Sequence, residues 1–136
     1  MTMAQMEESI QEDLTQLGDP LSQMEYLMAC ARAHEGIPPE ERRDENLVAD
    51  CQAKTWVETR WEQGRLRLLA DSESFLVRGV LALLCELYQH RTPEEVAAYS
   101  CTLLDRPGVR GRLTDGQYRG LSSVLARLHR EGEERT

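Results

Sequence analysis

Residues 54–88, KTWVETRWEQGRLRLLADSESFLVRGVLALLCELY, contain the patterns that decide the fold. The first part of this stretch, Lys54 to Trp61, is rich in Thr, Val and Trp, which favour β-strands. Gln63-Gly64 supplies a turn, and residues 65–68 alternate between arginine and leucine, so we expect a β-hairpin. A short extended segment at Leu47 to Ala49 raises the expected sheet to about three antiparallel strands.

The second part of the stretch predicts a helix at the centre of the core. We expect Asp71-Ser72 to cap this helix and Tyr88 to end it. Its apolar side chains cover a wide arc and comprise Leu76, Val77, Val80, Leu81, Leu83, Leu84, Leu87 and Tyr88. A helix that is apolar over most of its circumference belongs in the interior of a protein.

Further helices are expected on both sides of the hairpin. Before it, residues 4–17 and about 20–34 carry apolar residues at helical spacing. After it, Thr92-Pro93-Glu94-Glu95 and Thr114-Asp115-Gly116-Gln117 are capping boxes, which start helices. The charged tail, residues 131–136, is expected to fray. Strands and helices that are segregated along the chain indicate an α+β fold.

The size and charge of the chain suit one soluble domain that spans residues 1–136. A chain of 136 residues buries a sizeable core without disulfides or metal. Its formal net charge of −8 repels phosphate backbones, so nucleic acid is not an expected partner. The longest mainly apolar run, residues 75–88, is too short to cross a bilayer. Residues 1–17 lack the sections of a signal peptide, so we expect a cytoplasmic protein without a membrane partner.

The cysteine spacing and the missing motifs limit the kinds of site that the sequence supports. The four cysteines are Cys30, Cys51, Cys85 and Cys101, and no two of them have the C-x-x-C spacing of a zinc or thioredoxin-type site. Motifs for nucleotide binding and for a serine nucleophile are also missing from the sequence. We therefore expect neither a metal nor a resident cofactor.

Cys51 differs from the other cysteines in its position. It lies between a charged loop and the first expected strand, whereas the other three lie in apolar helical surroundings, where thiols are mostly inert. No histidine is close in sequence to act as its base. A thiol without a dedicated base suits sulfur-for-sulfur exchange, which requires an accessible thiolate and a partner sulfur. A loop thiol of no consequence is the alternative that the local residues leave open.

Residues 46–56, with Cys51-Gln52 and Trp56, resemble the signature of the SufE family of sulfur acceptor proteins. Other segments that resemble this family follow in the same order, and the similarity covers about residues 20–130. These segments are Gly64-Arg65-Leu66, Ala70-Asp71-Ser72-Glu73, Val77 to Leu84, Leu87-Tyr88, Arg91 to Val96, Leu113-Thr114 and Gly120-Leu121.

The resemblance implies a SufE/NifU-like α+β fold, with a small curved antiparallel sheet covered by helices. It implies that Cys51 accepts sulfane sulfur from the persulfide of a PLP-dependent, SufS-like cysteine desulfurase and stimulates that enzyme. The sulfur would then pass to an iron–sulfur scaffold of the SufBCD type. PLP would belong to the desulfurase, so this chain would carry no cofactor and would not be a stand-alone enzyme. A monomer or a weak homodimer is expected.

The sequence departs from the family pattern near the cysteine and in the last helix. Asp50 replaces the usual glycine, and the arginine of the family falls on Gln117. Arg119 lies nearly on the opposite side of the helix from Gln117. The candidates for loop and partner contacts are Asp50, Gln52, Lys54, Asp71, Glu73, Gln117 and Arg119.

Two other functions agree with these residues. One is a CsdE-like carrier that feeds a different sulfur acceptor. The other is a non-catalytic module that binds a desulfurase, which the changes at Asp50 and Gln117 motivate.

The charges next to Cys51 yield a first prediction. Asp50 disfavours the thiolate of Cys51, and we expect the positive charge of Lys54 to offset this effect. Lys54→Glu should therefore slow the alkylation of Cys51 at neutral pH, measured as the rate of iodoacetamide labelling. An unchanged rate would remove this role of Lys54.

Overall fold

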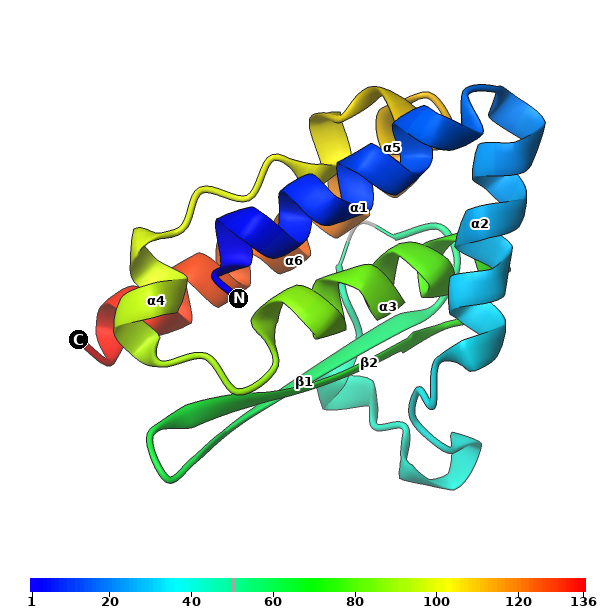
Figure 1. Cartoon of the computed structure of the whole chain (residues 1–136). Coiled ribbons are helices and arrows are strands. Elements are labelled where there is room, and N and C mark those ends of the chain that lie inside the picture. Colours follow the sequence, from blue (N-terminus) through cyan, green and yellow to red (C-terminus); the bar gives the residue numbers. More distant parts are fainter. Residues whose placement is uncertain (50) are drawn as a thin grey trace.

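The fold is an antiparallel β-hairpin with helices packed over one of its faces (Figure 1). The computed structural model describes residues 1–49 and 51–136. The elements in chain order are α1 (Met3–Leu17), α2 (Pro20–Ala33), two 3-10 turns (Pro39–Glu41 and Asp44–Asn46), β1 (Thr55–Glu62), β2 (Arg65–Ser72), α3 (Phe75–Tyr88), α4 (Pro93–Ala98), a third 3-10 turn (Leu103–Asp105), α5 (Pro107–Arg110) and α6 (Asp115–Glu134). The expected α+β class is confirmed.

The hairpin forms as the sequence predicts. Strands β1 and β2 pair from Thr55 opposite Ser72 to Glu62 opposite Arg65. Gln63 and Gly64 form the turn with φ angles of 53° and 74°, the left-handed conformations that a tight two-residue hairpin turn requires. The alternating leucines of β2 point into the core, where Leu66 is fully buried.

The sheet has two strands rather than the expected three. Before β1, Leu47 forms only an isolated bridge with Trp56, and the Val48 N–H donates to the Thr55 carbonyl at 2.8 Å. Pairing stops after this contact among the described residues, because the chain turns from the hairpin toward α6. Residues 49–54, which follow this bridge, are called the cysteine loop below.

The cap of α3 also differs from the expectation. Asp71 and Ser72 continue β2, where they pair with Trp56 and Thr55. Ser74 caps the helix instead, and its side chain accepts a hydrogen bond from the Val77 N–H at 3.2 Å. Asp71 does not serve as a cap because its carboxylate is bound inside the protein.

The C-terminal residues are more ordered than expected, because α6 continues to Glu134. The Glu131 carboxylate accepts hydrogen bonds from the Thr59 hydroxyl at 2.8 Å and from the Trp61 indole N–H at 3.0 Å. Gly132 packs so closely on α4 that a Cβ there would lie 2.9 Å from the Ala97 nitrogen. The expectation of a frayed tail is therefore wrong for residues 131–134.

Helix α3 lies at the centre of the core, and α2 crosses it near its start. A Cβ at Gly79 would lie 2.2 Å from the Leu27 carbonyl oxygen, so this crossing requires a glycine. The Arg78 guanidinium donates to the carbonyls of Ala31 and His34 and so caps the end of α2. Within the described part of the chain, no helix combines the length and the hydropathy needed to cross a bilayer.

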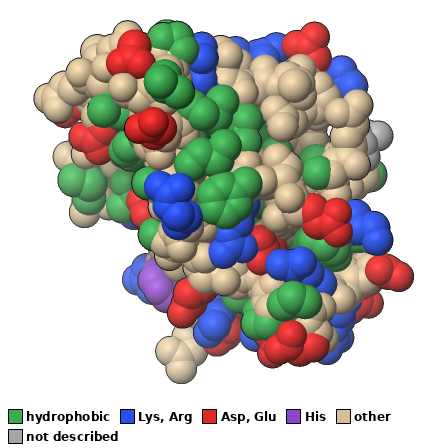
Figure 2. Space-filling model, turned by 90° about the vertical axis from the view of Figure 1, so that its right-hand side faces the viewer, with side chains coloured by type: hydrophobic (Ala, Val, Ile, Leu, Met, Phe, Trp, Pro, Cys, Tyr) green, Lys and Arg blue, Asp and Glu red, His purple; other side chains and the backbone are tan. Residues whose placement is uncertain are grey.

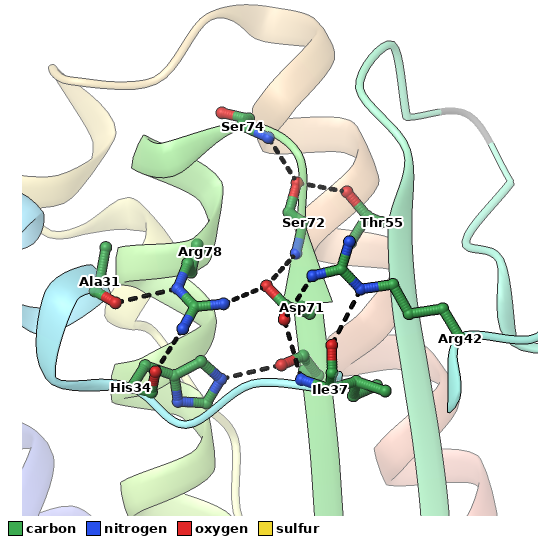
Figure 3. Close-up of polar contacts among 10 residues, drawn as sticks. Ala31, His34, Ile37, Arg42, Thr55, Asp71, Ser72, Ser74 and Arg78 are labelled. Atoms are coloured by element: carbon green, nitrogen blue, oxygen red, sulfur yellow. Dashed lines mark hydrogen bonds and ion pairs between the residues drawn. The ribbon is translucent and has the colours of Figure 1, made fainter. Parts of the chain in front are cut away.

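Asp71 joins these elements through a buried network (Figure 3). Its side chain is only 2% exposed, and its carboxylate accepts hydrogen bonds from the Ile37 N–H at 2.8 Å, from Arg42 at 3.0 Å and from Arg78. The Ser72 N–H donates at 2.8 Å to Oδ1, the oxygen that Arg78 also contacts, whereas Ile37 and Arg42 donate to Oδ2. Burial opposes ionisation, but these donors outweigh it and hold the pKa of Asp71 below its ordinary value.

Replacing Asp71 with Asn should lower the free energy of unfolding by about 3 kcal/mol, because it leaves two partly buried guanidinium groups without their counter-charge. Urea denaturation at pH 7 measures this change. The wild-type protein should lose the contribution as the pH falls below about 4, because its lowered pKa makes protonation favour the unfolded chain.

Glu45→Gln is the matched control, because Glu45 pairs with Arg43 on the surface with about 70% of both side chains exposed. We expect almost no change in stability for this variant. Equal losses in the two variants would contradict the importance of the Asp71 network.

Candidate functional site

The chain around Cys51 lies along one face of α6. Residues 47–49 line a cavity of about 250 Å³ together with α6 side chains, which include Ser123 and Arg130. Cys51 lies one turn nearer the start of the helix, at Gly120, and Gln52 lies a further turn along. The segment therefore runs in the opposite direction to α6 and stays close to it.

The thiol of Cys51 occupies the space that a side chain at residue 120 would fill. A Cβ built on Gly120 would lie 2.3 Å from the Cys51 Sγ atom and 3.5 Å from its Cβ atom. Contacts of a Cβ below 3.0 Å essentially do not occur in proteins. Gly120 is buried and Cys51 is half-buried, so the thiol rests against bare helix backbone near the surface.

Two other candidate residues lie beside the thiol. A Cβ at Gly116 would lie 3.7 Å from the side-chain amide of Gln52 and 3.9 Å from the Arg119 guanidinium. The side chains of Gln52 and Arg119 thus approach the same glycine from the loop and from the helix. The structure brings Cys51, Gln52 and Arg119 together on this face of α6.

The remaining candidates have other positions. Lys54 and Glu73 are both exposed, and the Glu73 N–H donates to the Lys54 carbonyl at 2.9 Å beside the start of β1. The Gln117 side chain accepts a hydrogen bond from the Thr114 N–H at 2.9 Å in the capping box of α6. The carboxylate of Asp71 is held inside the protein, and Asp50 lies outside the described residues.

The other three cysteines are held in environments that suppress the thiolate. Burial, followed by the negative charge of Glu86, raises the pKa of Cys30 to about 11 and that of Cys85 to about 12. Burial also raises the pKa of Cys101 to about 11. Cys30 and Cys85 line a cavity of about 730 Å³ between α2, β2 and α3, away from Cys51. These thiols remain protonated at neutral pH.

Exposed apolar side chains lie at the starts of α2 and α3. Figure 2 shows the side of the molecule on which α2 lies, where hydrophobic side chains gather beside Lys and Arg side chains. Leu21 at the start of α2 is 69% exposed, and Phe75 at the start of α3 is 44% exposed. Phe75 follows directly after the Glu73–Lys54 hydrogen bond, so it lies close to the end of the cysteine loop.

Gly116 and Gly120, two of the three glycines of α6, are functional candidates that the residue types alone did not reveal. A glycine within a helix costs about 1 kcal/mol relative to alanine, so two of them four residues apart require a packing reason. This spacing was the signal available in the sequence. No three His, Cys, Asp or Glu side chains converge on a possible metal site within residues 1–49 and 51–136.

Comparison with known proteins agrees with this geometry. A family model described as "SufE: Fe-S metabolism associated domain" matches residues 8–132. The chain belongs to the SufE family. The sulfur acceptor protein CsdE of Escherichia coli K12 is 30% identical over 111 residues, which are 77% of this chain and 76% of the relative. The resemblance seen in the sequence is therefore confirmed.

Two further comparisons extend over nearly the whole chain. An uncharacterized SufE-like protein of Rhizobium etli is 25% identical over 138 residues, covering 98% of this chain and 93% of the relative. The solution structure of a hypothetical protein from Thermus thermophilus superimposes with a TM-score of 0.75 at 23% identity, covering 95% and 94% of the two chains. The second comparison shows that the fold is shared.

The environments of the four thiols predict selective labelling. Limited iodoacetamide at pH 7.5 should modify Cys51 in the folded protein, because Cys30, Cys85 and Cys101 have pKa values raised to about 11, 12 and 11. Peptide mass spectrometry measures the site, and labelling in urea, where all four should react, is the control. Equal labelling of all four in the folded protein would contradict this assignment.

Proposed function

We propose that this SufE-family protein is a sulfur acceptor that takes sulfane sulfur from the persulfide of a cysteine desulfurase onto Cys51. One observation supports this most directly. Cys51 is half-buried against Gly120 in a stretch of sequence that resembles the family's acceptor-cysteine signature, whereas the other three thiols have raised pKa values. The name of its relative CsdE, a sulfur acceptor protein, agrees with this role.

The transfer is an exchange between sulfur atoms. The Cys51 thiolate attacks the outer sulfur of the desulfurase persulfide and forms a new S–S bond with it. The S–S bond within the donor persulfide breaks, and its electron pair stays on the desulfurase cysteine as a thiolate. The proton released from the Cys51 thiol passes to solvent or to the departing thiolate. No outside oxidant or reductant is needed, because one persulfide replaces another.

The surroundings of Cys51 suit contact with a protein donor. Two sulfur atoms react only within contact distance, so the donor must cover the surface around Cys51. Gln52, Lys54 and Arg119 present polar groups there, and Lys54 is the only lysine of the chain. The exposed apolar side chain of Phe75 lies near the same surface. By removing sulfur from the desulfurase, the acceptor would also stimulate its turnover.

The Cys51 persulfide would then be delivered to an acceptor cysteine on an iron–sulfur scaffold. The similarity to CsdE favours a second version of this function, in which the carrier pairs with a different desulfurase and feeds another sulfur acceptor. Pull-down of the chain against a SufS-like desulfurase and against the desulfurase that serves a CsdE-like carrier distinguishes the two by the partner that is retained.

Intact-mass measurement tests sulfur acceptance. The protein mixed with desulfurase, PLP and cysteine should gain the mass of one sulfur atom, and dithiothreitol should remove it. Cys51→Ser should gain nothing, because a hydroxyl does not form a persulfide, while Cys101→Ser should behave as the wild type. A wild-type protein that binds a desulfurase without gaining mass would instead be a non-catalytic binding module.

A further inference from the structure

We infer that Gly120 is a positioning residue for the acceptor thiol and sets how readily Cys51 leaves α6 to meet a donor sulfur. This inference rests on the proposed role of Cys51 but concerns a different residue. It starts from the position of the Cys51 Sγ atom, which lies only 2.3 Å from where the Cβ atom of any other residue at position 120 would be.

The helix at Gly120 has little freedom to move away. On one side of this residue, Thr114 and Gln117 form the capping box of α6. On the other side, the fully buried Leu128 and the contacts of Glu131 with β1 fix the helix against the core. Added volume at residue 120 is therefore accommodated by the cysteine loop rather than by α6.

The loop is held mainly at its base. Main-chain hydrogen bonds join Val48 to Thr55 and Lys54 to Glu73 on either side of it. Cys51 and Gln52 form no main-chain hydrogen bond to another described residue, and their side chains pack on Gly120 and Gly116. Within the described part of the chain, the contacts with these two glycines hold Cys51 and Gln52 beside the helix.

Sulfur transfer requires the opposite arrangement. The Cys51 sulfur must come within contact distance of a sulfur on another protein, so Cys51 must leave its place at Gly120. The apparent affinity for a donor is proportional to the fraction of molecules in which the thiol is free of α6. It therefore decreases as that fraction decreases. Gly120 preserves the docked state, and a larger residue would shift the population toward the presented thiol.

Gly120→Ala and Gly116→Ala form a matched pair. Both substitutions add one methyl group to the same face of α6. At residue 120 the new Cβ atom would lie 2.3 Å from the Cys51 Sγ atom, whereas at residue 116 it would lie 3.7 Å from Gln52, an ordinary contact. Only the first substitution should displace the thiol.

The first test is labelling of Cys51 by iodoacetamide in the absence of any desulfurase. We expect Gly120→Ala to react about tenfold faster than the wild type and Gly116→Ala to stay within about twofold of it. A Gly120→Ala rate equal to that of the wild type, or equal rates for the two variants, would overturn the inference.

If Gly120→Ala folds poorly, its effect on Tm can be compared in the wild-type and Cys51→Ala backgrounds. Cys51→Ala removes Sγ and leaves two Cβ atoms 3.5 Å apart, which is an acceptable contact. Any loss of Tm caused by Gly120→Ala should therefore disappear in the Cys51→Ala background. A loss that persists there would place the clash elsewhere and overturn the inference.

The second test uses the desulfurase and separates this inference from the proposed function. Gly120→Ala should lower the KM for the desulfurase and change kcat less, because more molecules present the thiol before the encounter. An unchanged or raised KM would overturn the inference. A wild-type protein that accepts no sulfur would refute the proposed function, while the labelling rates would still report on Gly120.

Discussion

The buried carboxylate of Asp71 is the interaction on which the other elements depend. Burying one charge is costly, and four donors offset that cost, one from the neighbouring Ser72 and three from outside β2. These donors fix the segment after α2 against β2 and α3, and Gly36 allows the close approach because a Cβ there would lie 2.2 Å from Asp71. The same network places the Arg42 guanidinium 4.7 Å over the Trp56 ring. The end of the hairpin at which the cysteine loop is attached is thereby held rigid.

A second constraint fixes the helix against which the thiol rests. Glu131 joins the far end of α6 to β1, and a capping box fixes its start. The cysteine loop thus lies between a fixed hairpin and a fixed helix, and it contacts the helix at two glycines. This arrangement places the Cys51 thiol against α6 near the surface, and in the proposed transfer the loop is the part that must move.

Local signals in the sequence predicted local structure well. The turn at Gln63-Gly64 and the capping boxes at Thr92 and Thr114 depend on neighbouring residues, and all three form as expected. The errors arose where distant residues decide. Asp71 does not cap α3, because its carboxylate binds Arg42, which is 29 residues away in the sequence. Glu131 is held in place by a hydrogen bond from Trp61, which is 70 residues away. Cys51 could be selected from its polar surroundings and its resemblance to the SufE family. The contact of Cys51 with Gly120 could not be predicted, because two glycines in a helix indicate close packing but do not identify the residue that packs there.

Single-turnover transfer is the most direct test of Cys51 as an acceptor. A desulfurase is loaded with persulfide, freed from cysteine and mixed with an equal amount of this protein, and both cysteines are followed by peptide mass spectrometry after rapid quenching. The persulfide should disappear from the desulfurase at the rate at which it appears on Cys51. Sulfur that stays on the desulfurase, or that appears on Cys30, Cys85 or Cys101 instead, would contradict the assignment of Cys51 as the acceptor.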